Sequence, residues 1–192
     1  MITVRRFLFV AVCLIPFTLS AQNNIFKGRL LALPTGNFTL YSFGIGYERM
    51  FTRHLSAQIL FDKSGKAVYT DGSSYRLSAF IPEIRYYFRK TRPFNEAYFF
   101  GIFTEFARKT TTSGGEVIRL YPDEEQTQIN PGFLFGKSFR IGKHWRLEGY
   151  AGAKYQIIRD EHPFLYNDGF RFETIRYNQW GIRLGVNAGF GY

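Results

Sequence analysis

The sequence of 192 residues contains a single cysteine, Cys13, and lacks the apolar runs that several membrane-spanning helices would need. Each such helix requires about 20 consecutive apolar residues, so a helical membrane protein with several spans is excluded. Intrinsic disorder is excluded as well, because disordered chains are poor in aromatic residues and 19% of this sequence is aromatic. Charged residues make up another 21%, and the mean hydropathy is -0.18. The chain therefore combines many rings and many charges without a long apolar stretch.

Residues 1–21 are predicted to be a secretory signal peptide. Two arginines precede the apolar run Phe7–Phe17, and small residues follow it up to Ala21. This order of charged, apolar and small residues is typical of a signal that is removed during export, here by cleavage after Ser20 or Ala21. The single cysteine lies within the apolar run. We therefore expect one mature domain, residues 22–192, that has no disulfide although it leaves the cytoplasm.

Apolar and polar residues alternate with a period of two along the mature sequence, which predicts β-strands. The clearest strand is Trp180–Tyr192, where apolar residues occupy the even positions and glycine or polar residues the odd ones. The same pattern predicts seven further strands, at residues 26–33, 38–50, 54–63, 75–89, 97–109, 128–140 and 145–159.

The connections between these strands alternate in length. Short connections are predicted at residues 50–53, 90–96 and 141–144, and long polar ones at residues 64–74, 110–127 and 160–174. Only the tight connection at residues 34–37 departs from this pattern. Short turns at one end and long loops at the other are typical of outer-membrane barrels. The predicted fold class is all-β, an eight-stranded antiparallel transmembrane β-barrel preceded by a cleaved signal peptide.

Alternation alone fits two barrels with opposite faces. A soluble lipocalin-like barrel holds its apolar residues inside, whereas a membrane barrel turns them toward lipid. Glycines fall on the polar face, where they would weaken a water-facing strand but would fit the narrow interior of an eight-stranded barrel. Their placement favours the membrane barrel. The glycines predicted to point inward are Gly44, Gly46, Gly101, Gly132, Gly136, Gly152, Gly181, Gly185 and Gly189.

Acidic and basic residues share this polar face near the strand centres, together with Lys27 and Arg29. Buried charges are costly unless they are paired, so the near balance of the two signs predicts a network of ion pairs inside the barrel. We expect this network to be structural, and we expect no catalytic residues, no metal site and no cofactor. Its predicted members are Glu48, Glu83, Arg85, Glu105, Arg146, Glu148, Lys154 and Arg183.

Aromatic residues gather on the apolar face toward the short turns, a distribution that suits a membrane interface. The terminal Phe190-Gly191-Tyr192 resembles the signal by which outer-membrane barrels are recognised for insertion. Together with the signal peptide, the eight strands and the segment Glu83–Phe88, it makes the chain similar to the small OmpA-type and OmpX-type barrels of double-membrane bacteria. The resemblance implies a place in the outer membrane, contact with its lipid, and the barrel-assembly machinery as a partner during insertion.

Candidates for further chemistry are few. His54 and Ser56 lie two residues apart, as a barrel-type lipid A deacylase would need for its nucleophilic pair, but we expect an interior polar pair. The acidic runs 123–125 and 160–162 lack the spacing of a calcium loop and are expected to be solvated. The formal net charge of +10 is divided among the signal, the lumen and the strand ends, so nucleic acid is not an expected partner.

The expected function is that of a small, non-enzymatic outer-membrane barrel that is structural or binds a surface partner, not identified by the sequence, through its long loops. Two alternatives stay open. One is a lipid-modifying enzyme of the deacylase type that would use His54 and Ser56, and the other is a soluble lipocalin-like barrel that carries an apolar ligand.

Overall fold

The computed structural model of the chain describes residues 24–35, 38–64, 67–68, 74–88, 97–112, 124–166 and 169–191, nearly all of them in strands. The strands are β1 (Asn24–Thr35), β2 (Phe38–Met50), β3 (Leu55–Ser64), β4 (Ala67–Val68), β5 (Ser74–Tyr87), β6 (Ala97–Thr112), β7 (Glu124–Ile141), β8 (Trp145–Tyr166) and β9 (Gly169–Gly191). These residues include no helix that is long and apolar enough to cross a membrane. The predicted signal peptide and Tyr192 of the predicted insertion signal lie outside the described residues.

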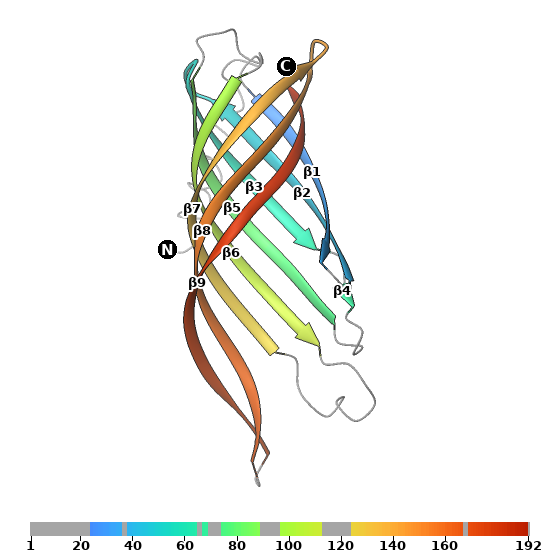
Figure 1. Ribbon diagram of the computed structural model, residues 1–192, viewed down its shortest axis with the longest axis vertical. Helices are drawn as coiled ribbons and strands as arrows, with labels where there is room; N and C mark the ends of the chain where they lie inside the picture. The colour runs from blue at the N-terminus through green and yellow to red at the C-terminus, as the bar shows by residue number, and fades with distance from the viewer. Residues whose placement is uncertain are drawn as a thin grey trace, which may run out of the picture.

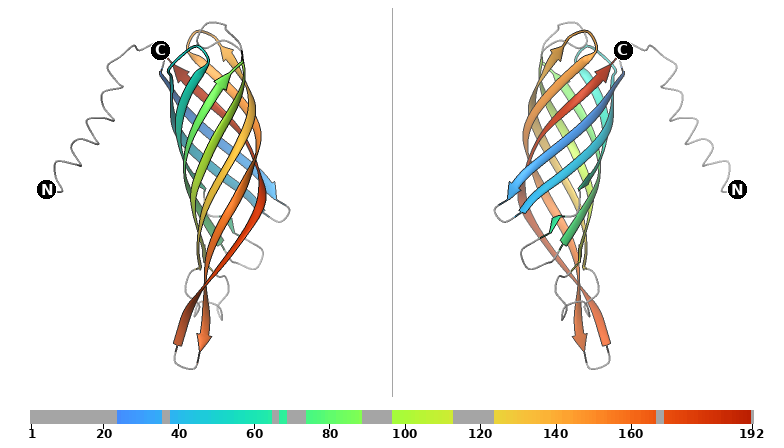
Figure 2. Two further views of the ribbon diagram at one scale, coloured as in Figure 1. Left: turned by 90° about the vertical axis from the view of Figure 1, so that its left-hand side faces the viewer. Right: turned by 90° about the vertical axis from the view of Figure 1, so that its right-hand side faces the viewer.

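The strands form one antiparallel sheet that closes on itself (Figures 1 and 2). Neighbours follow the order β3-β2-β1-β9-β8-β7-β6-β5, and β3 pairs with β5 to complete the ring. The first and last strands meet where Ile25 of β1 pairs with Gly191 of β9. Beside this junction Phe190 packs against Trp145, with the two ring centroids 5.2 Å apart. The predicted eight-stranded antiparallel barrel is confirmed, and the short β4 continues beyond β3 along β5.

The two ends of the barrel differ in their connections. Short turns join β2 to β3 and β7 to β8 at the end where the C-terminus lies (Figure 1). At the opposite end β8 and β9 extend past the other strands as a paired hairpin, which we call the hairpin arm (residues 162–166 and 169–173). The prediction of a long loop over residues 160–174 is therefore wrong. The strand β4 and the loop-side ends of β6 and β7 also occupy parts of the other two predicted loops.

The loop-side part of β9 escaped the sequence pattern because neither of its faces is buried. Alternation marks a strand only where one of its faces is buried, whereas residues 173–180 of β9 are exposed at every position. Cross-strand pairing holds this part of β9 and the hairpin arm instead, since β8 and β9 stay in register from Tyr155 to Tyr166. Backbone pairing of this kind leaves no hydropathy signal in the sequence.

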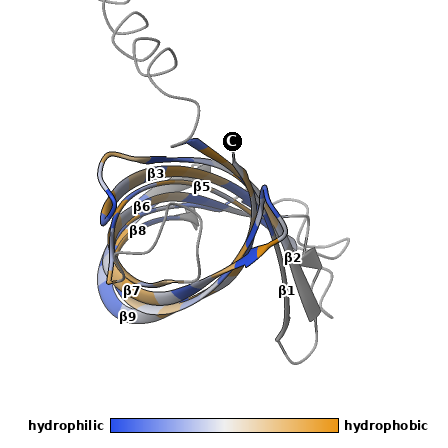
Figure 3. Ribbon diagram, turned by 90° about the horizontal axis from the view of Figure 1, so that it is seen from above, coloured by the Kyte–Doolittle hydropathy of each residue, from blue (hydrophilic) through white to orange (hydrophobic). Residues whose placement is uncertain are grey.

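Side chains alternate between the interior and the outer wall of the barrel. On β6 the odd-numbered residues from Ala97 to Ala107 are buried, whereas the phenylalanines at even positions and Ile102 are exposed. All eight long strands contribute large apolar side chains to the outer wall, and Trp180 and Ile182 are 71% and 77% exposed. Hydrophilic and hydrophobic residues both occur along the strands of the ring seen from above (Figure 3). This burial agrees with the two faces predicted from the glycines.

Large side chains fill the interior beside inward glycines. Phe99 lies opposite Gly136 on the neighbouring strand, and Tyr150 lies opposite Gly185. A Cβ atom at Gly136 would lie 2.4 Å from Phe99 Cζ, and one at Gly185 would lie 2.3 Å from the Tyr150 hydroxyl oxygen. The inward rings therefore occupy the space that the missing side chains of the facing glycines leave. This is expected for a barrel that is too narrow to hold large side chains on every strand.

Candidate functional site

Charged side chains of the interior come together from both neighbouring and distant strands of the ring. Five of them form what we call the buried cluster: Lys27 on β1, Glu48 on β2, Arg85 on β5, and Arg146 and Glu148 on β8. Their side chains are at most 4% exposed. Each occupies an inward position in its strand, so the alternation that sends rings outward also brings these charges together.

Glu148 is surrounded by three cations. Its Oε2 atom lies 2.6 Å from Lys27 Nζ and 2.8 Å from Arg85 Nη1, and its Oε1 atom lies 3.5 Å from Arg146 Nη1. Asn187 Nδ2 also donates to Oε2 at 3.4 Å. Because Arg85 on β5 and Glu148 on β8 are not on neighbouring strands, their ion pair connects separate parts of the barrel wall across the lumen.

Glu48 is held by charged and neutral donors together. Lys27 Nζ lies 2.6 Å from its Oε2 atom, and Arg146 Nη1 lies 3.5 Å from the same oxygen. The Ser56 and Tyr87 hydroxyls donate to its Oε1 atom at 2.5 and 2.7 Å. Both carboxylate oxygens therefore have the close partners that a buried charge requires.

Glu83 links the buried cluster to Arg183 on β9. Its Oε1 atom accepts a hydrogen bond from Arg85 Nε at 2.5 Å, and its Oε2 atom accepts one from Arg183 Nη1 at 3.2 Å. Both guanidinium groups also lie over rings, Arg85 at 4.3 Å from the centroid of Phe99 and Arg183 at 4.2 Å from that of Phe103. Desolvated cation–π contacts stabilise by about 2 kcal/mol each. The arginines are thus held by both carboxylates and rings.

Two further ion pairs lie nearer the loop end of the lumen. Lys154 Nζ is 2.6 Å from Glu105 Oε1, which also accepts a hydrogen bond from Asn130 Nδ2 at 2.8 Å. Arg29 pairs with Asp62. The first pair joins β8 to β6 and the second joins β1 to β3, so each spans an intervening strand. These ion pairs stabilise the barrel wall in addition to the backbone hydrogen bonds between neighbouring strands.

All predicted network residues lie on the inward face, but they form two groups. Glu48, Arg85, Arg146 and Glu148 meet in the buried cluster, with Glu83 and Arg183 attached, whereas Glu105 and Lys154 form a separate pair. The predicted set omitted Lys27, although Lys27 contacts both Glu48 and Glu148. It also omitted inward polar partners that the same alternation would have identified, namely Ser56, Gln58, Asp62, Asn130 and Asn187.

His54 and Ser56, the candidate nucleophilic pair, each contact other groups. The fully buried Ser56 hydroxyl donates to Glu48, as described above. His54 Nδ1 lies 2.8 Å from the Tyr87 carbonyl oxygen, and its ring stacks on Tyr86 with the centroids 5.6 Å apart. Within the described part of the chain no hydrogen bond joins His54 to Ser56. His54 therefore packs against neighbouring groups near the end of the barrel, and Ser56 serves as a buried hydrogen-bond donor to Glu48.

Glu124 and Glu125 of the first acidic run and all of the second run lie on strands, whereas Asp123 lies outside the described residues. One acid of each run forms an exposed ion pair. Glu125 on β7 pairs with Arg108 at 2.5 Å, and Glu161 on β8 pairs with Arg159 at 3.2 Å. Among the described residues, no group of three or more histidine, cysteine or acidic side chains is placed to hold a metal ion. These carboxylates therefore balance neighbouring cations on the outside of the barrel.

Comparisons with known proteins relate the chain to one family by sequence and to solved outer-membrane β-barrels by fold. The model of a family described as "Protein of unknown function (DUF3575)" matches residues 7–182. The crystal structure of Neisserial surface protein A is similar with a TM-score of 0.52 and 15% identity, over 90% of this chain and 98% of that one. A major outer membrane protein from Thermus thermophilus gives a TM-score of 0.52 and 11% identity, over 90% of this chain and 100% of that one.

No curated protein matches the sequence. At identities this low the structural likeness shows the fold alone. The predicted likeness to small outer-membrane barrels is confirmed for the fold, whereas a relation to the OmpA-type or OmpX-type families stays a prediction.

Proposed function

Since the chain belongs to DUF3575, a family of proteins of unknown function, we propose a function from the barrel itself. The protein is a small, non-enzymatic barrel of the bacterial outer membrane, inserted with the short turns toward the periplasm and the loop end outside. Its buried charges hold the barrel together, and its loops and hairpin arm serve surface contacts. Its fold neighbours, which include a major outer membrane protein, support this location.

The observation that carries the proposal is the inverted distribution of polarity. Carboxylates and cations are buried inside, whereas the wall exposes large apolar residues such as Ile45, Ile102 and Ile182 at 67%, 53% and 77%. Water would penalise an apolar surface that covers all strands of the ring. Lipid carries no such penalty for an apolar surface. The hydrogen bonds between the strands of the closed ring also satisfy the backbone N–H and C=O groups, which lipid could not hydrogen-bond. The bilayer is thus the medium that matches this wall.

The same distribution argues against a soluble carrier of an apolar ligand. Such a barrel needs an apolar cavity and a polar wall, whereas this interior holds ion pairs such as Arg85–Glu148 and Lys154–Glu105. The packed rings of Phe99 and Tyr150 occupy further interior space. Neither feature offers an acyl chain a site inside the barrel.

Fractionation of cells is the test of the membrane location. We expect the full-length protein in the outer-membrane fraction, and we expect its unheated and boiled forms to migrate differently on a detergent gel, because closed barrels resist unfolding in detergent. A soluble periplasmic marker and an inner-membrane marker serve as controls. Recovery of the protein as a soluble periplasmic monomer would contradict the proposal.

The non-enzymatic part of the proposal has its own test. Purified protein in mixed micelles with an acylated, phosphorylated glycolipid is expected to release no fatty acid above the buffer rate, since the Ser56 hydroxyl is fully buried and donates to Glu48, not to His54. Release of acid that is lost in both His54→Ala and Ser56→Ala would show an enzyme instead. Folding of Ser56→Ala must be measured in parallel, because Glu48 loses one donor at a cost of about 1–3 kcal/mol.

A further inference from the structure

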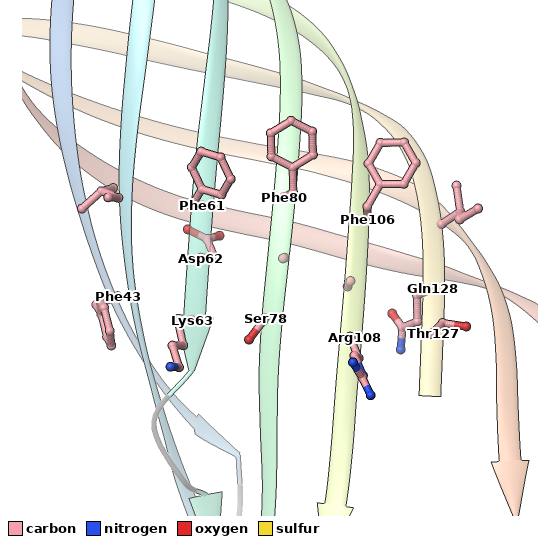
Figure 4. A pocket seen from close by; sticks show the side chains of 14 residues that line it. Phe43, Phe61, Asp62, Lys63, Ser78, Phe80, Phe106, Arg108, Thr127 and Gln128 are labelled. Atoms are coloured by element: carbon pink, nitrogen blue, oxygen red, sulfur yellow. The ribbon is translucent and has the colours of Figure 1, made fainter. Parts of the chain in front are cut away.

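A groove of about 700 Å³ lies on the outer wall toward the loop end, across strands β2, β3, β5, β6 and β7 (Figure 4). Its apolar part contains Phe61, Phe80 and Phe106, which are direct cross-strand neighbours. They are 37–53% exposed, so they form a ridge of rings on the wall. Phe43, Ile45 and Ile129 extend this apolar lining.

Polar and cationic side chains border the ridge on its loop side. Lys63, Ser78 and Arg108 follow one another on β3, β5 and β6 as direct cross-strand neighbours, two residues beyond the three phenylalanines. All three are exposed and line the groove, as Figure 4 shows. Adjacent strands are about 4.8 Å apart, so the backbone positions of the two cations lie about 10 Å from each other. Their long side chains can therefore reach one group placed over Ser78.

The same register continues around the barrel as a row of cations. After Arg108 it passes through Thr127 to Arg159 and Arg176, and it includes no acidic residue. The acids Glu125 and Glu161 lie two residues farther out on β7 and β8. From the middle of the wall toward the loops, the surface is thus first apolar, then basic and only then acidic.

The two cations of the groove differ in their present contacts. Arg108 Nη2 donates to Glu125 Oε1 and Oε2 at 2.5 and 2.6 Å, with side chains 61% and 44% exposed. An exposed pair of this kind contributes about 0–1 kcal/mol, so a competing anion can replace the carboxylate. Lys63 has no ion-pair partner among the residues that the structure describes. Both cations are therefore available to an anion in the groove.

The short-turn edge of the same wall has a different character. There exposed rings such as Tyr86, Phe88 and Trp145 lie near exposed cations of the turns, such as Arg53 and Arg140. Rings with a polar atom suit an interface without a particular charge. Cations therefore occur at both edges of the wall, and the loop-side edge is distinguished by the alignment of Lys63 and Arg108 directly beyond the rings of the groove.

We propose that this groove binds a lipid with a phosphomonoester headgroup, the phosphate lying between Lys63 and Arg108 over Ser78 and an acyl chain lying along Phe61, Phe80 and Phe106. The charges are complementary, because two exposed cations and a hydroxyl face a dianion and arginine can bind two of its oxygens. The acidic residue of the lining, Asp62, is largely buried and is already paired with Arg29. The apolar lining is continuous with the lipid-facing wall, which favours a lipid over a free phosphate. The proposal rests on the membrane location proposed above.

Native mass spectrometry of the full protein in detergent tests the site, with bisphosphorylated lipid A as the probe. We expect Lys63→Gln/Arg108→Gln to weaken retention of this lipid about tenfold, since charge-assisted bonds are lost. The matched control is Arg159→Gln/Arg176→Gln, which removes the same charge from the same row outside the groove and is expected to change retention less than about twofold. Equal weakening by both pairs would overturn the site, because it would show general attraction to a basic surface.

Further measurements with the same method identify the source of the phosphate and the role of the Arg108–Glu125 ion pair. Dephosphorylated lipid A should bind about tenfold more weakly than the intact probe, and millimolar inorganic phosphate should not displace the probe. Glu125→Gln should strengthen binding, because it frees Arg108 from its present partner. Displacement by inorganic phosphate, or weaker binding in Glu125→Gln, would overturn the proposal. Absence of the protein from the outer-membrane fraction would instead contradict the proposed location, so the two failures are distinguishable.

Discussion

Glu148→Gln is expected to destabilise the barrel by about 3–5 kcal/mol, the cost of leaving a buried ionic group without its partner. The substitution keeps the shape of the side chain but removes the charge on which Lys27, Arg85 and Arg146 converge. All of these groups are at most 4% exposed, so water cannot replace the carboxylate without opening the wall. Urea unfolding of the protein in detergent micelles, followed by tryptophan fluorescence, measures the loss.

A second substitution separates charge imbalance from lost packing. Lys27→Met added to Glu148→Gln removes one of the unbalanced cations and is expected to recover about 1–3 kcal/mol, the usual coupling between contacting residues. Glu161→Gln is the control, because it breaks the exposed pair with Arg159 and should cost about 0–1 kcal/mol. If Glu148→Gln were no worse than Glu161→Gln, the buried cluster would not stabilise the barrel.

Much of this cluster could be predicted because charge and alternation point to the same face. Glu48 and Glu148 sit in strands whose wall-facing residues are apolar, so period two alone turns them inward. Which charges touch could not be predicted, since Arg85–Glu148 is a contact across the lumen and depends on the tilt and stagger of the closed ring. The same limit explains why Glu105 and Lys154 were grouped with charges from which the structure separates them.

The apolar residues that fill the lumen are harder to predict from the sequence than the charged ones. Leu60 and Phe99 are apolar and buried, yet they share the inward face with charges and glycine. Residue type alone would place them on the wall. Their inward position follows from period two, but the space that they occupy depends on the neighbouring strand, where Gly46 lies opposite Leu60 and Gly136 opposite Phe99. The pattern along a single strand cannot predict that pairing, because the pairing depends on the register between neighbouring strands.

The wall groove depends on register in the same way. Lys63 and Arg108 are 45 residues apart in the sequence numbering, and only the pairings of β3, β5 and β6 bring them to either side of Ser78. Taken singly, basic residues at strand ends indicate nothing more than solvated charges. Their alignment just beyond the ridge of phenylalanines is what turns separate charges into a candidate lipid site.

The second large effect is expected from Gly152→Val, which should destabilise the barrel by about 3 kcal/mol or more, at the upper end of the cost of overpacking. A Cβ atom at Gly152 would lie 2.2 Å from the Phe133 carbonyl oxygen and 2.7 Å from Leu134 Cβ. The first of these neighbours is backbone, so the strands must separate to admit any side chain. The temperature at which the compact band disappears on a detergent gel, together with urea unfolding, measures the loss.

Gly149→Val on the same strand is the matched control, since a Cβ atom at Gly149 would meet nothing within 4 Å. Gly149 faces the wall, three residues from the inward Gly152. Valine there has lower unfolded-state entropy than glycine and should be neutral or stabilise by up to about 1 kcal/mol. Opposite results at two glycines of one strand can arise only if one face is packed and the other is open to lipid or detergent. Equal loss at both positions would contradict the assignment of the two faces, and with it the argument for a membrane barrel.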